Sequence, residues 1–220
     1  MRGVFVTGTG TEVGKTVVGS VLARTAAAGG QRVAVFKPAV SGLDEGGEPD
    51  HAMLRRASGS GQSDDEIAPY RYGPPVSPHL AAELADEAID PARLREAAAR
   101  AGEQGDLLVV EGVGGLLVPL TLGYLVRDFA RDLGLPVMIA ASPTLGTINH
   151  TLLTIEGVRA VGLEVAGVVL TPWPAEPGTL ELSNRDAIER LGDVRVETLV
   201  EIDPARPESW PALEFPQTAA

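Results

Sequence analysis

A glycine-rich loop between the first apolar run and the first helical run constrains the fold more than any other feature of the chain. Residues 4–6 are apolar, residues 8–14 are rich in glycine and threonine, and residues 15–28 place apolar side chains at helical spacing. A strand, such a loop and a helix in direct succession form a phosphate-binding unit. The backbone N–H groups of the loop and the helix N-terminus then face one anion. This unit predicts an α/β fold.

The alternation of apolar and helical runs continues along the chain. We predict further strands at 33–36, 107–110, 137–141, 165–170 and 194–199, and further helices at 50–57, 79–87, 91–101, 125–133, 147–161 and 179–191. This pattern predicts a doubly wound, mostly parallel sheet with helices on both faces, in the P-loop NTPase-like α/β class. The run 107–110 is too apolar for an exposed edge, so we expect a central strand there. The polar stretch 59–78 is expected to be mostly connection.

Length and charge narrow the function classes. The 220 residues predict a single domain, 1–220, with a surface tail from about residue 207. A net charge of −12 argues against nucleic-acid binding, and the absence of cysteine excludes disulfides and cysteine-ligated metals. No secretory signal and no apolar run long enough to span a membrane is present, so we expect a cytoplasmic protein.

The first glycine loop carries the residues of a nucleotide site. In a phosphate loop the lysine reaches the β- and γ-phosphates and the following hydroxyl is a ligand of Mg²⁺. Lys15 and Thr16 occupy these positions. The strict phosphate-loop motif has glycine at the position of Thr9. The alternative is an ordinary glycine-rich turn at the start of a helix. The nucleotide-binding residues expected here are Glu12, Val13, Gly14, Lys15, Thr16 and Val17.

The chain contains only two lysines among its 18 basic residues, and both follow predicted strands. Lys37 stands directly after the strand 33–36. Strand 1 of a doubly wound sheet usually neighbours strand 2, so we expect Lys37 to face the crevice that holds Lys15. Ser41 lies four residues on and can reach the same pocket. The alternative for Lys37 is a solvated surface lysine.

Two carboxylates are candidate ligands of Mg²⁺, which prefers oxygen and retains few protein ligands. Glu111 directly follows the apolar run 107–110 and precedes a second glycine loop, whose Gly112, Val113 and Gly114 are further candidate nucleotide contacts. Asp50, at the start of a short helix, is the plausible second carboxylate, and its alternative role is an N-cap. Residues 142–150 and 171–174 also follow strands. These loops therefore lie at the sheet edge where such folds bind ligands.

With these motifs the chain resembles the dethiobiotin synthetases, the ATP-dependent carboxylases of biotin synthesis. The resemblance rests on motifs spread from residue 3 to about residue 203. They are Gly8-Thr9-x-Thr11-Glu12-Val13-Gly14-Lys15-Thr16, Lys37-Pro38 with Ser41-Gly42, Asp50, Val110-Glu111-Gly112-x-Gly114-Gly115-Leu116-Leu117-Val118-Pro119 and Leu145-Gly146-Thr147-Ile148-Asn149-His150-Thr151.

The resemblance implies a reaction and a set of roles. The substrates would be 7,8-diaminononanoate, CO₂ and ATP with Mg²⁺, and the products dethiobiotin, ADP and phosphate. Lys37 and Lys15 would stabilise the reacting anions, Thr11 and Ser41 would bind the substrate head, and Thr16, Asp50 and Glu111 would hold the metal. In this family the substrate carboxylate is bound by the partner subunit, so a homodimer with a shared site is implied. The matching residues here are Leu145, Gly146 and Asn149.

The chain departs from the family pattern where the base is read. Many members have aspartate at the position of Gly10, and an asparagine for adenine where this chain has Thr171-Pro172. The family's Glu-Ile-Pro segment appears as Glu201-Ile202-Asp203. We count Thr171, Pro172, Glu201, Ile202 and Asp203 as nucleotide contacts, and expect nucleoside triphosphates other than ATP to be accepted.

Three alternative functions share parts of this pattern. Cell-division and plasmid-partition ATPases and the nitrogenase iron-protein group use nucleotide as a conformational switch, but their phosphate loop has a lysine where this chain has Gly10. Cobyrinate-type amide synthetases usually carry a glutaminase domain with a nucleophilic cysteine, which this chain lacks. A catalytically dead paralogue that only binds nucleotide is the third alternative.

Overall fold

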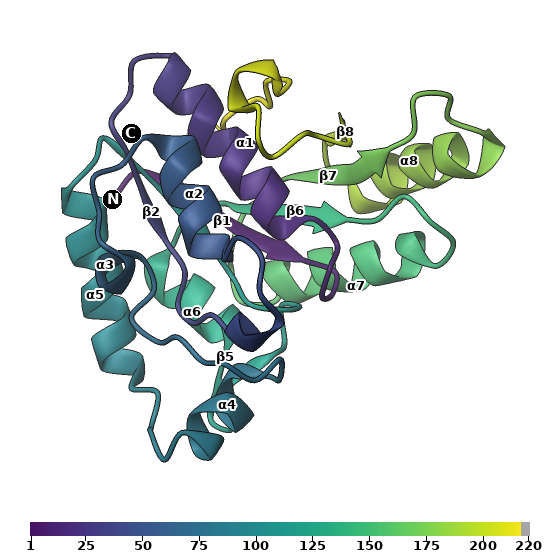
Figure 1. Ribbon diagram of the computed structural model, residues 1–220. Helices are drawn as coiled ribbons and strands as arrows, with labels where there is room; N and C mark the ends of the chain where they lie inside the picture. The colour runs from purple at the N-terminus through teal and green to yellow at the C-terminus, as the bar shows by residue number, and fades with distance from the viewer. Residues whose placement is uncertain (217–220) are drawn as a thin grey trace.

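The computed structural model, which describes residues 1–216, is built around one six-stranded sheet in which every neighbouring pair of strands is parallel (Figure 1). This confirms the predicted α/β class. In sheet order the strands are β2 (Val33–Phe36), β3 (Leu107–Glu111), β1 (Gly3–Gly8), β6 (Val137–Ala141), β7 (Val165–Trp173) and β8 (Val196–Val200).

Helices cover both faces of the sheet, and each face has its own apolar core. On one face lie α1 (Lys15–Ala28) and α2 (Asp50–Ser58), beside the short α3 (Asp64–Ile67). The other face is covered by α5 (Pro91–Glu103), α6 (Val126–Leu133), α7 (Thr147–Arg159) and α8 (Thr179–Gly192). The remaining elements are α4 (Pro78–Leu84), the hairpin β4 (Pro119–Thr121) and β5 (Tyr124–Leu125), and the 3₁₀ turns η1 (Leu43–Glu45) and η2 (Pro207–Ser209).

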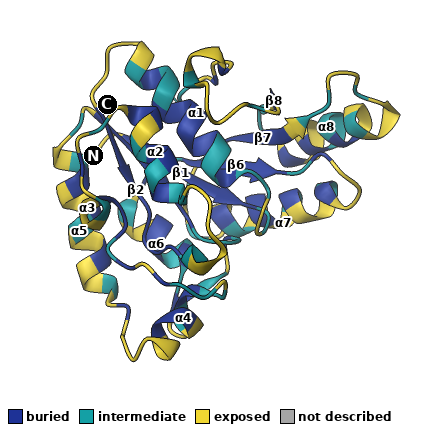
Figure 2. Ribbon diagram, in the orientation of Figure 1, coloured by how far each residue is buried: buried dark blue, intermediate teal, exposed yellow. Residues whose placement is uncertain are grey.

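The central strands are apolar throughout because their side chains alternate between two buried layers. In β1, Val4 and Val6 enter the core under α1, whereas Phe5 enters the opposite core and packs edge-on against Phe129. In Figure 2 these strands are dark blue, and exposed positions gather on the outer sides of the helices. The same alternation in β3 explains why it is a central strand, as predicted.

The strand order corrects one sequence-based expectation. We expected the first two strands to be neighbours, but β3 lies between β1 and β2 and pairs with both. The crossover from β1 through α1 therefore skips one position in the sheet. β3, the next strand of this sheet along the chain, fills that position. Periodicity within a run shows that a strand is buried on both faces, and it carries no information about which strands flank it.

Three connections also differ from expectation. Residues 59–78 contain α3, which begins with a capping box between Ser63 and Glu66. The helix predicted over 79–87 ends at Leu84, because Asp86 adopts a left-handed backbone conformation at φ 52°. The hairpin β4–β5 was not predicted, since each of its strands has only two or three residues.

The expected surface tail is anchored to the protein. Trp210 and Leu213 are 9% and 3% exposed and belong to the core between α1 and the sheet. The backbone N–H of Leu213 donates to Thr25 Oγ1 of α1, at 3.4 Å. The prediction of a surface tail is therefore wrong for these two side chains, and residues 217–220 lie outside the described residues.

Within residues 1–216, no helix combines the length and the apolar character that crossing a bilayer requires.

Candidate active site

The phosphate loop follows β1 and closes against the start of α1. Gly14 sits at φ 86°, a conformation that glycine adopts readily, and a Cβ there would lie 2.5 Å from Thr171 Cγ2. Lys15 is buried and its Nζ donates to the carbonyl of Gly10 at 2.8 Å. The loop is therefore folded around the lysine, and its last glycine is pressed against the end of β7.

Four side chains meet beside this loop, three from α1, α2 and β3 and one from the residue that follows β2. Lys37 Nζ lies 2.6 Å from Glu111 Oε1 and 2.8 Å from Asp50 Oδ2. The Thr16 hydroxyl lies 3.0 Å from Asp50 Oδ1 and 2.9 Å from Glu111 Oε1, to either of which it can donate its one proton. Lys37, Asp50 and Glu111 therefore form a charge cluster at the first turn of α1.

Lys37 reaches this cluster even though β2 is not adjacent to β1. Strand β3 lies between them, and Glu111 at its end bridges the gap. The segment after β2 is held in place by α3, since the backbone N–H of Lys37 donates to the carbonyl of Ile67 at 2.8 Å. The expected meeting of the two lysines is thus found, but through an intervening strand.

Burial and charge oppose each other in this cluster. Burial alone would lower the pKa of Lys37, but the charges of Glu111 and Asp50 outweigh it, and the pKa of Lys37 is raised. Burial would raise the pKa of Asp50, but the Lys37 charge outweighs it, and that pKa is lowered. Burial raises the pKa of Glu111, and the Asp50 charge adds to this against the opposing charges of Lys37 and Lys15. Burial lowers the pKa of Lys15. Lys37, Asp50 and Glu111 together carry one more negative than positive charge, and the charge of Lys15 acts on the same two carboxylates.

The two carboxylates of the cluster suit a divalent cation that is bound by oxygen. Glu111 Oε2 is fully buried, and no described residue gives it a hydrogen-bond partner. Carboxylate and hydroxyl oxygens are the ligands that Mg²⁺ prefers, and it retains several waters. Within the described chain, no group of three or more His, Cys, Asp or Glu side chains forms a complete metal cage. Thr16, Asp50 and Glu111 therefore suit a cation whose remaining ligands come from water and phosphate.

A pocket of about 460 Å³ opens onto the cluster. Most of the predicted nucleotide and catalytic residues line it: Thr11, Glu12, Gly14, Lys15, Thr16, Val17, Lys37, Ser41, Asp50, Glu111, Val113 and Gly114. Two predicted residues of the glycine loops, Gly112 and Val13, do not line it. A Cβ on Gly112 would lie 3.0 Å from Val126 and 3.2 Å from Phe5, so this glycine packs against the core. Val13 also packs against the core, under α1.

Two further hollows meet this pocket at Thr11. The first adds Gly42 and residues 75–78 to Ser41, Glu45 and Gly114. The second is mostly apolar and runs between the second glycine loop and α7, past Leu116, Leu117 and Leu153. Sequence reasoning missed Glu45 and residues 75–78. The adjacent Pro74-Pro75 and the Ser77-Pro78 helix start could have marked 75–78 as an ordered turn.

The predicted base contacts lie at the ends of β7 and β8. Thr171 is buried against Gly14, whereas Pro172 is exposed. Ile202 packs against the core under α1, and Glu201 is exposed. The carboxylate of Asp203 is already paired, with Arg206 Nε at 2.7 Å and the backbone N–H of Ala205 at 2.9 Å. None of these residues lines the phosphate pocket itself.

The predicted carboxylate-binding segment lies apart from the phosphate pocket. Leu145 is 86% exposed, and Gly146 and Asn149 are exposed at the start of α7. Asn184 of α8 holds the preceding loop, because its buried amide donates to the carbonyl of Pro143 at 2.9 Å. The structure therefore presents this helix start at the surface, away from Lys15 and Lys37.

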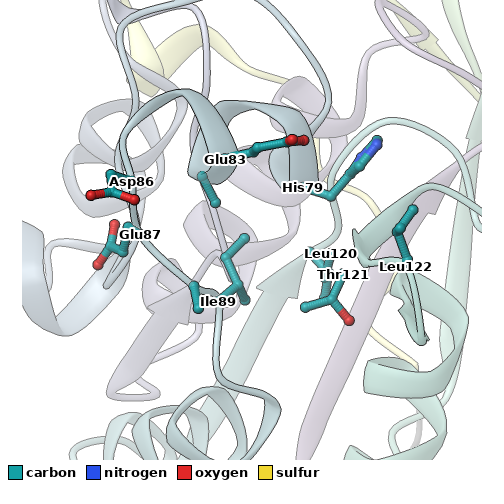
Figure 3. A pocket seen from close by; sticks show the side chains of 10 residues that line it. His79, Glu83, Asp86, Glu87, Ile89, Leu120, Thr121 and Leu122 are labelled. Atoms are coloured by element: carbon teal, nitrogen blue, oxygen red, sulfur yellow. The ribbon is translucent and has the colours of Figure 1, made fainter.

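A separate pocket between α4 and the β4–β5 hairpin contains none of the predicted site residues. Figure 3 shows Asp86 and Glu87 on one side of it and His79 and Leu122 on the other. The Glu87 carboxylate accepts from the Tyr72 hydroxyl, and His79 Nδ1 lies 3.0 Å from Ser77 Oγ. These polar groups are thus engaged with their own neighbours.

Comparison with known proteins gives close sequence relatives over most of the chain. Residues 2–207 match the family described as "AAA domain". The chain is 47% identical to an ATP-dependent dethiobiotin synthetase of Anaeromyxobacter dehalogenans, over 87% of this chain and 86% of the relative. The proteins of that name from Rhodococcus erythropolis and Bacillus subtilis are 40% and 38% identical. The first match covers 98% of this chain and 93% of the relative, and the second 89% and 85%.

Solved structures share the fold at much lower identity. The cell division ATPase MinD of Pyrococcus furiosus superimposes with a TM-score of 0.56 at 16% identity, over 94% of this chain and 86% of that one. The kinase domain of the Escherichia coli tyrosine kinase ETK gives 0.50 at 19% identity, over 81% and 70%. Likeness at this level shows a common architecture and nothing of the reaction.

Proposed function

This chain belongs to the dethiobiotin synthetase family, and on that premise we propose that its site closes the ureido ring of dethiobiotin. The substrates are 7,8-diaminononanoate, CO₂ and ATP, and the products are dethiobiotin, ADP and phosphate. The observation that carries the proposal is that Lys37 and Thr16 each lie within 3.0 Å of both Asp50 and Glu111, beside Lys15. No switch function requires a second buried lysine at this position.

The reaction divides into three balanced steps. One amine adds to CO₂ and loses a proton, which forms a carbamate. A carbamate oxygen then attacks the γ-phosphorus, and the bond to ADP breaks. Finally the second amine attacks the carbamate carbon, and phosphate leaves with the bonding electrons while the amine loses a proton. Each step builds or moves negative charge, which fixed cations in a dry pocket stabilise.

The residues of the cluster suit these charges. Lys15 lies inside the phosphate loop and would contact the β- and γ-phosphates, while Lys37 would bridge the γ-phosphate and the carbamate. Thr16, Asp50 and Glu111 would hold Mg²⁺, which would supply positive charge to the phosphates. Thr11 and Ser41 would donate to the diamine end from the opposite wall.

The apolar hollow beside Thr11 suits the alkyl chain of the substrate. It passes Leu116, Leu117 and Leu153 and ends at α7, and Leu117 and Leu153 are each 58% exposed. Leu145, at the start of the same helix, is 86% exposed. Large apolar side chains exposed together mark an interface. We assign this face to a homodimer, in which residues 145–149 of the second subunit bind the substrate carboxylate.

The dimer is tested by mass measurement in solution. Wild-type protein is expected at twice the mass of one chain, and Leu145→Arg with Leu153→Arg is expected at the mass of one chain. The double variant should keep its affinity for ATP and lose affinity for diaminononanoate. A monomeric wild type that is fully active would disprove the shared site.

The base site favours broad nucleotide use. The asparagine expected for adenine is replaced by Thr171 and Pro172, and the carboxylate of Asp203 is occupied by Arg206. Few side-chain groups are left to distinguish one base from another, so we expect CTP, GTP and UTP to support turnover alongside ATP. The reaction uses metabolites of the cytoplasm, and we place the enzyme there.

One assay tests the function directly. Purified protein is incubated with Mg²⁺, diaminononanoate, ¹³C-bicarbonate and each nucleoside triphosphate in turn, and dethiobiotin is measured by mass spectrometry. Labelled dethiobiotin is expected from wild type and none from Lys37→Gln. Its absence with every triphosphate, from protein that binds nucleotide, would refute the proposed function and favour a switch or a dead paralogue.

A further inference from the structure

Arg56 connects two segments that lie 148 residues apart in the chain. Its guanidinium forms a fork with the Glu48 carboxylate, with Nε 2.9 Å from Oε1 and Nη2 2.6 Å from Oε2. The remaining nitrogen, Nη1, donates to the carbonyl of Pro204 at 2.7 Å. All three guanidinium nitrogens of this side chain are therefore engaged, and only the last contact leaves the neighbourhood of α2.

Both connected segments belong to the candidate active site. Arg56 lies on α2, whose first residue is Asp50 of the charge cluster, and Glu48 stands two residues before it. Pro204 follows β8 directly after the predicted base contacts, residues 201–203. Figure 1 shows the segment after β8, in yellow, passing beside α1. The contact thus ties the metal end of the site to the base end.

The strand order indicates where the nucleoside lies. Lys37 and Glu111 line the pocket on the β2–β3 side of β1, so the γ-phosphate end of a nucleotide would face that side. With its phosphates at the N-terminus of α1, a bound nucleotide would extend its nucleoside to the other side of β1, past Val17 and toward the ends of β7 and β8. Ile202 and Val17 both pack against the core on the α1 face of the sheet. The segment 201–204 follows β8 and therefore lies on the side of β1 to which the nucleoside would extend.

We propose that Arg56 is a positioning residue for the nucleoside, which holds the segment after β8 against the base end of the bound nucleotide. The inference rests on the proposed function only in assuming that a nucleotide occupies the pocket. Arg56 lines no part of that pocket and acts through the carbonyl that it binds.

The geometry calls for arginine at this position. A guanidinium presents a rigid fork to a carboxylate and keeps a further N–H for a third acceptor, whereas an ammonium is a single point donor. The Arg56 and Glu48 side chains are 36% and 38% exposed. A surface pair of this kind adds little to the stability of the fold. Its removal should therefore change the position of one loop without unfolding the protein.

The neighbouring Arg55 provides a matched control. It lies on the same helix, has the same charge and a similar exposure, and forms an ion pair with Asp64. No hydrogen bond or ion pair of Arg55 to the described segment after β8 is found. Arg55→Ala and Arg56→Ala are therefore compared, with Arg56→Lys as the conservative variant. The ligands are ATP and inorganic triphosphate, each with Mg²⁺. Triphosphate carries the phosphates and no nucleoside.

Arg56→Ala is expected to weaken ATP binding about five- to tenfold in calorimetry, the effect of one charge-assisted hydrogen bond. Triphosphate binding should stay within about twofold of wild type, as should ATP binding by Arg55→Ala. Arg56→Lys should recover part of the loss. In turnover, the KM for ATP should rise, while kcat and the KM for diaminononanoate stay near wild type.

Two outcomes overturn the inference. Unchanged ATP affinity in Arg56→Ala means that the contact does not position the segment. An equal loss for ATP and triphosphate means that Arg56 supports the phosphate loop or the fold as a whole. The binding measurements need no turnover. A wild type that binds ATP but makes no dethiobiotin would refute the proposed function and leave this inference standing.

Discussion

Lys37 Nζ lies 2.6 Å from Glu111 Oε1, and both groups are almost completely removed from solvent. Their strands, β2 and β3, are neighbours, so the two side chains extend from the same edge of the sheet. Asp50 Oδ2 lies 2.8 Å from the same Nζ, and the Asp50 side chain is 44% exposed. Lys37 therefore pairs with two carboxylates, of which Glu111 is fully buried and Asp50 is partly exposed to water.

Lys37→Gln should destabilise the protein more than a surface substitution does. It leaves Glu111 buried without its cation, which is expected to lower the free energy of unfolding by about 3–5 kcal/mol, less whatever protonation of Glu111 recovers. The double variant Lys37→Gln with Glu111→Gln removes both charges and should be more stable than Lys37→Gln alone. Urea denaturation of wild type, Lys37→Gln, Glu111→Gln and the double variant measures the coupling between the two side chains. Additive effects of the two substitutions would contradict it.

Nucleotide binding should be accompanied by proton uptake in alkaline solution. Burial lowers the pKa of Lys15 in the free protein below 10.5, and bound phosphate would raise it again. Affinity should therefore be fully present below the pKa of the free protein and fall as the pH rises through it. Calorimetry at about pH 9 in two buffers of different ionisation enthalpy measures the uptake. Lys15→Met should show none, and a wild type without buffer dependence would be inconsistent with this account.

The response to Mg²⁺ should depend on the hydroxyl of Thr16. In wild type, Mg²⁺ is expected to tighten ATP binding, and EDTA should abolish turnover. Thr16→Val removes an oxygen that lies within 3.0 Å of both carboxylates, and should cost about tenfold or more in kcat/KM. Its binding of ATP should be nearly insensitive to Mg²⁺, whereas Thr16→Ser should respond like wild type. Titrations of ATP with and without the metal separate these cases.

Two glycines of the phosphate loop should tolerate alanine differently. Gly14→Ala combines a left-handed backbone conformation with a contact of 2.5 Å to Thr171, and is expected to cost about 1–3 kcal/mol and most of the ATP affinity. Gly10→Ala, in the same loop, meets nothing within 4 Å and should bind ATP nearly normally. Adding Thr171→Ser to Gly14→Ala should recover only part of the loss. Thermal unfolding and ATP calorimetry on the same samples give both quantities.

The phosphate loop and its chemistry were predictable because they depend on local order in the chain. The spacing from Gly8 to Thr16 placed a cation, a hydroxyl and a helix start together, and Glu111 and Lys37 were found as polar residues that end apolar runs. What local order could not show was the position of β3 between β1 and β2. The two lysines meet, but the neighbour relation used to predict it was wrong.

Other features depend on contacts between distant segments. The burial of Trp210 and Leu213 requires the groove between α1 and the sheet, which no property of the last residues reveals. Glu45 reaches the pocket because Gly42, at φ 84°, turns the chain after Ser41. Arg56 was read only as part of a helix, because its partner carbonyl is 148 residues away. Such contacts appear only when the fold is assembled.

The order of strands in the sheet has a consequence for the growing polypeptide. β1 is made first, but both of its neighbours, β3 and β6, come from the middle of the chain. While the ribosome is still adding the first half of the chain, β1 has no neighbouring strand at either edge. The phosphate loop that follows β1 then lacks the strands that flank it in the folded protein. The two strands that flank β1 are therefore both available only once residue 141 has been added, and the phosphate loop gains its complete frame late in synthesis.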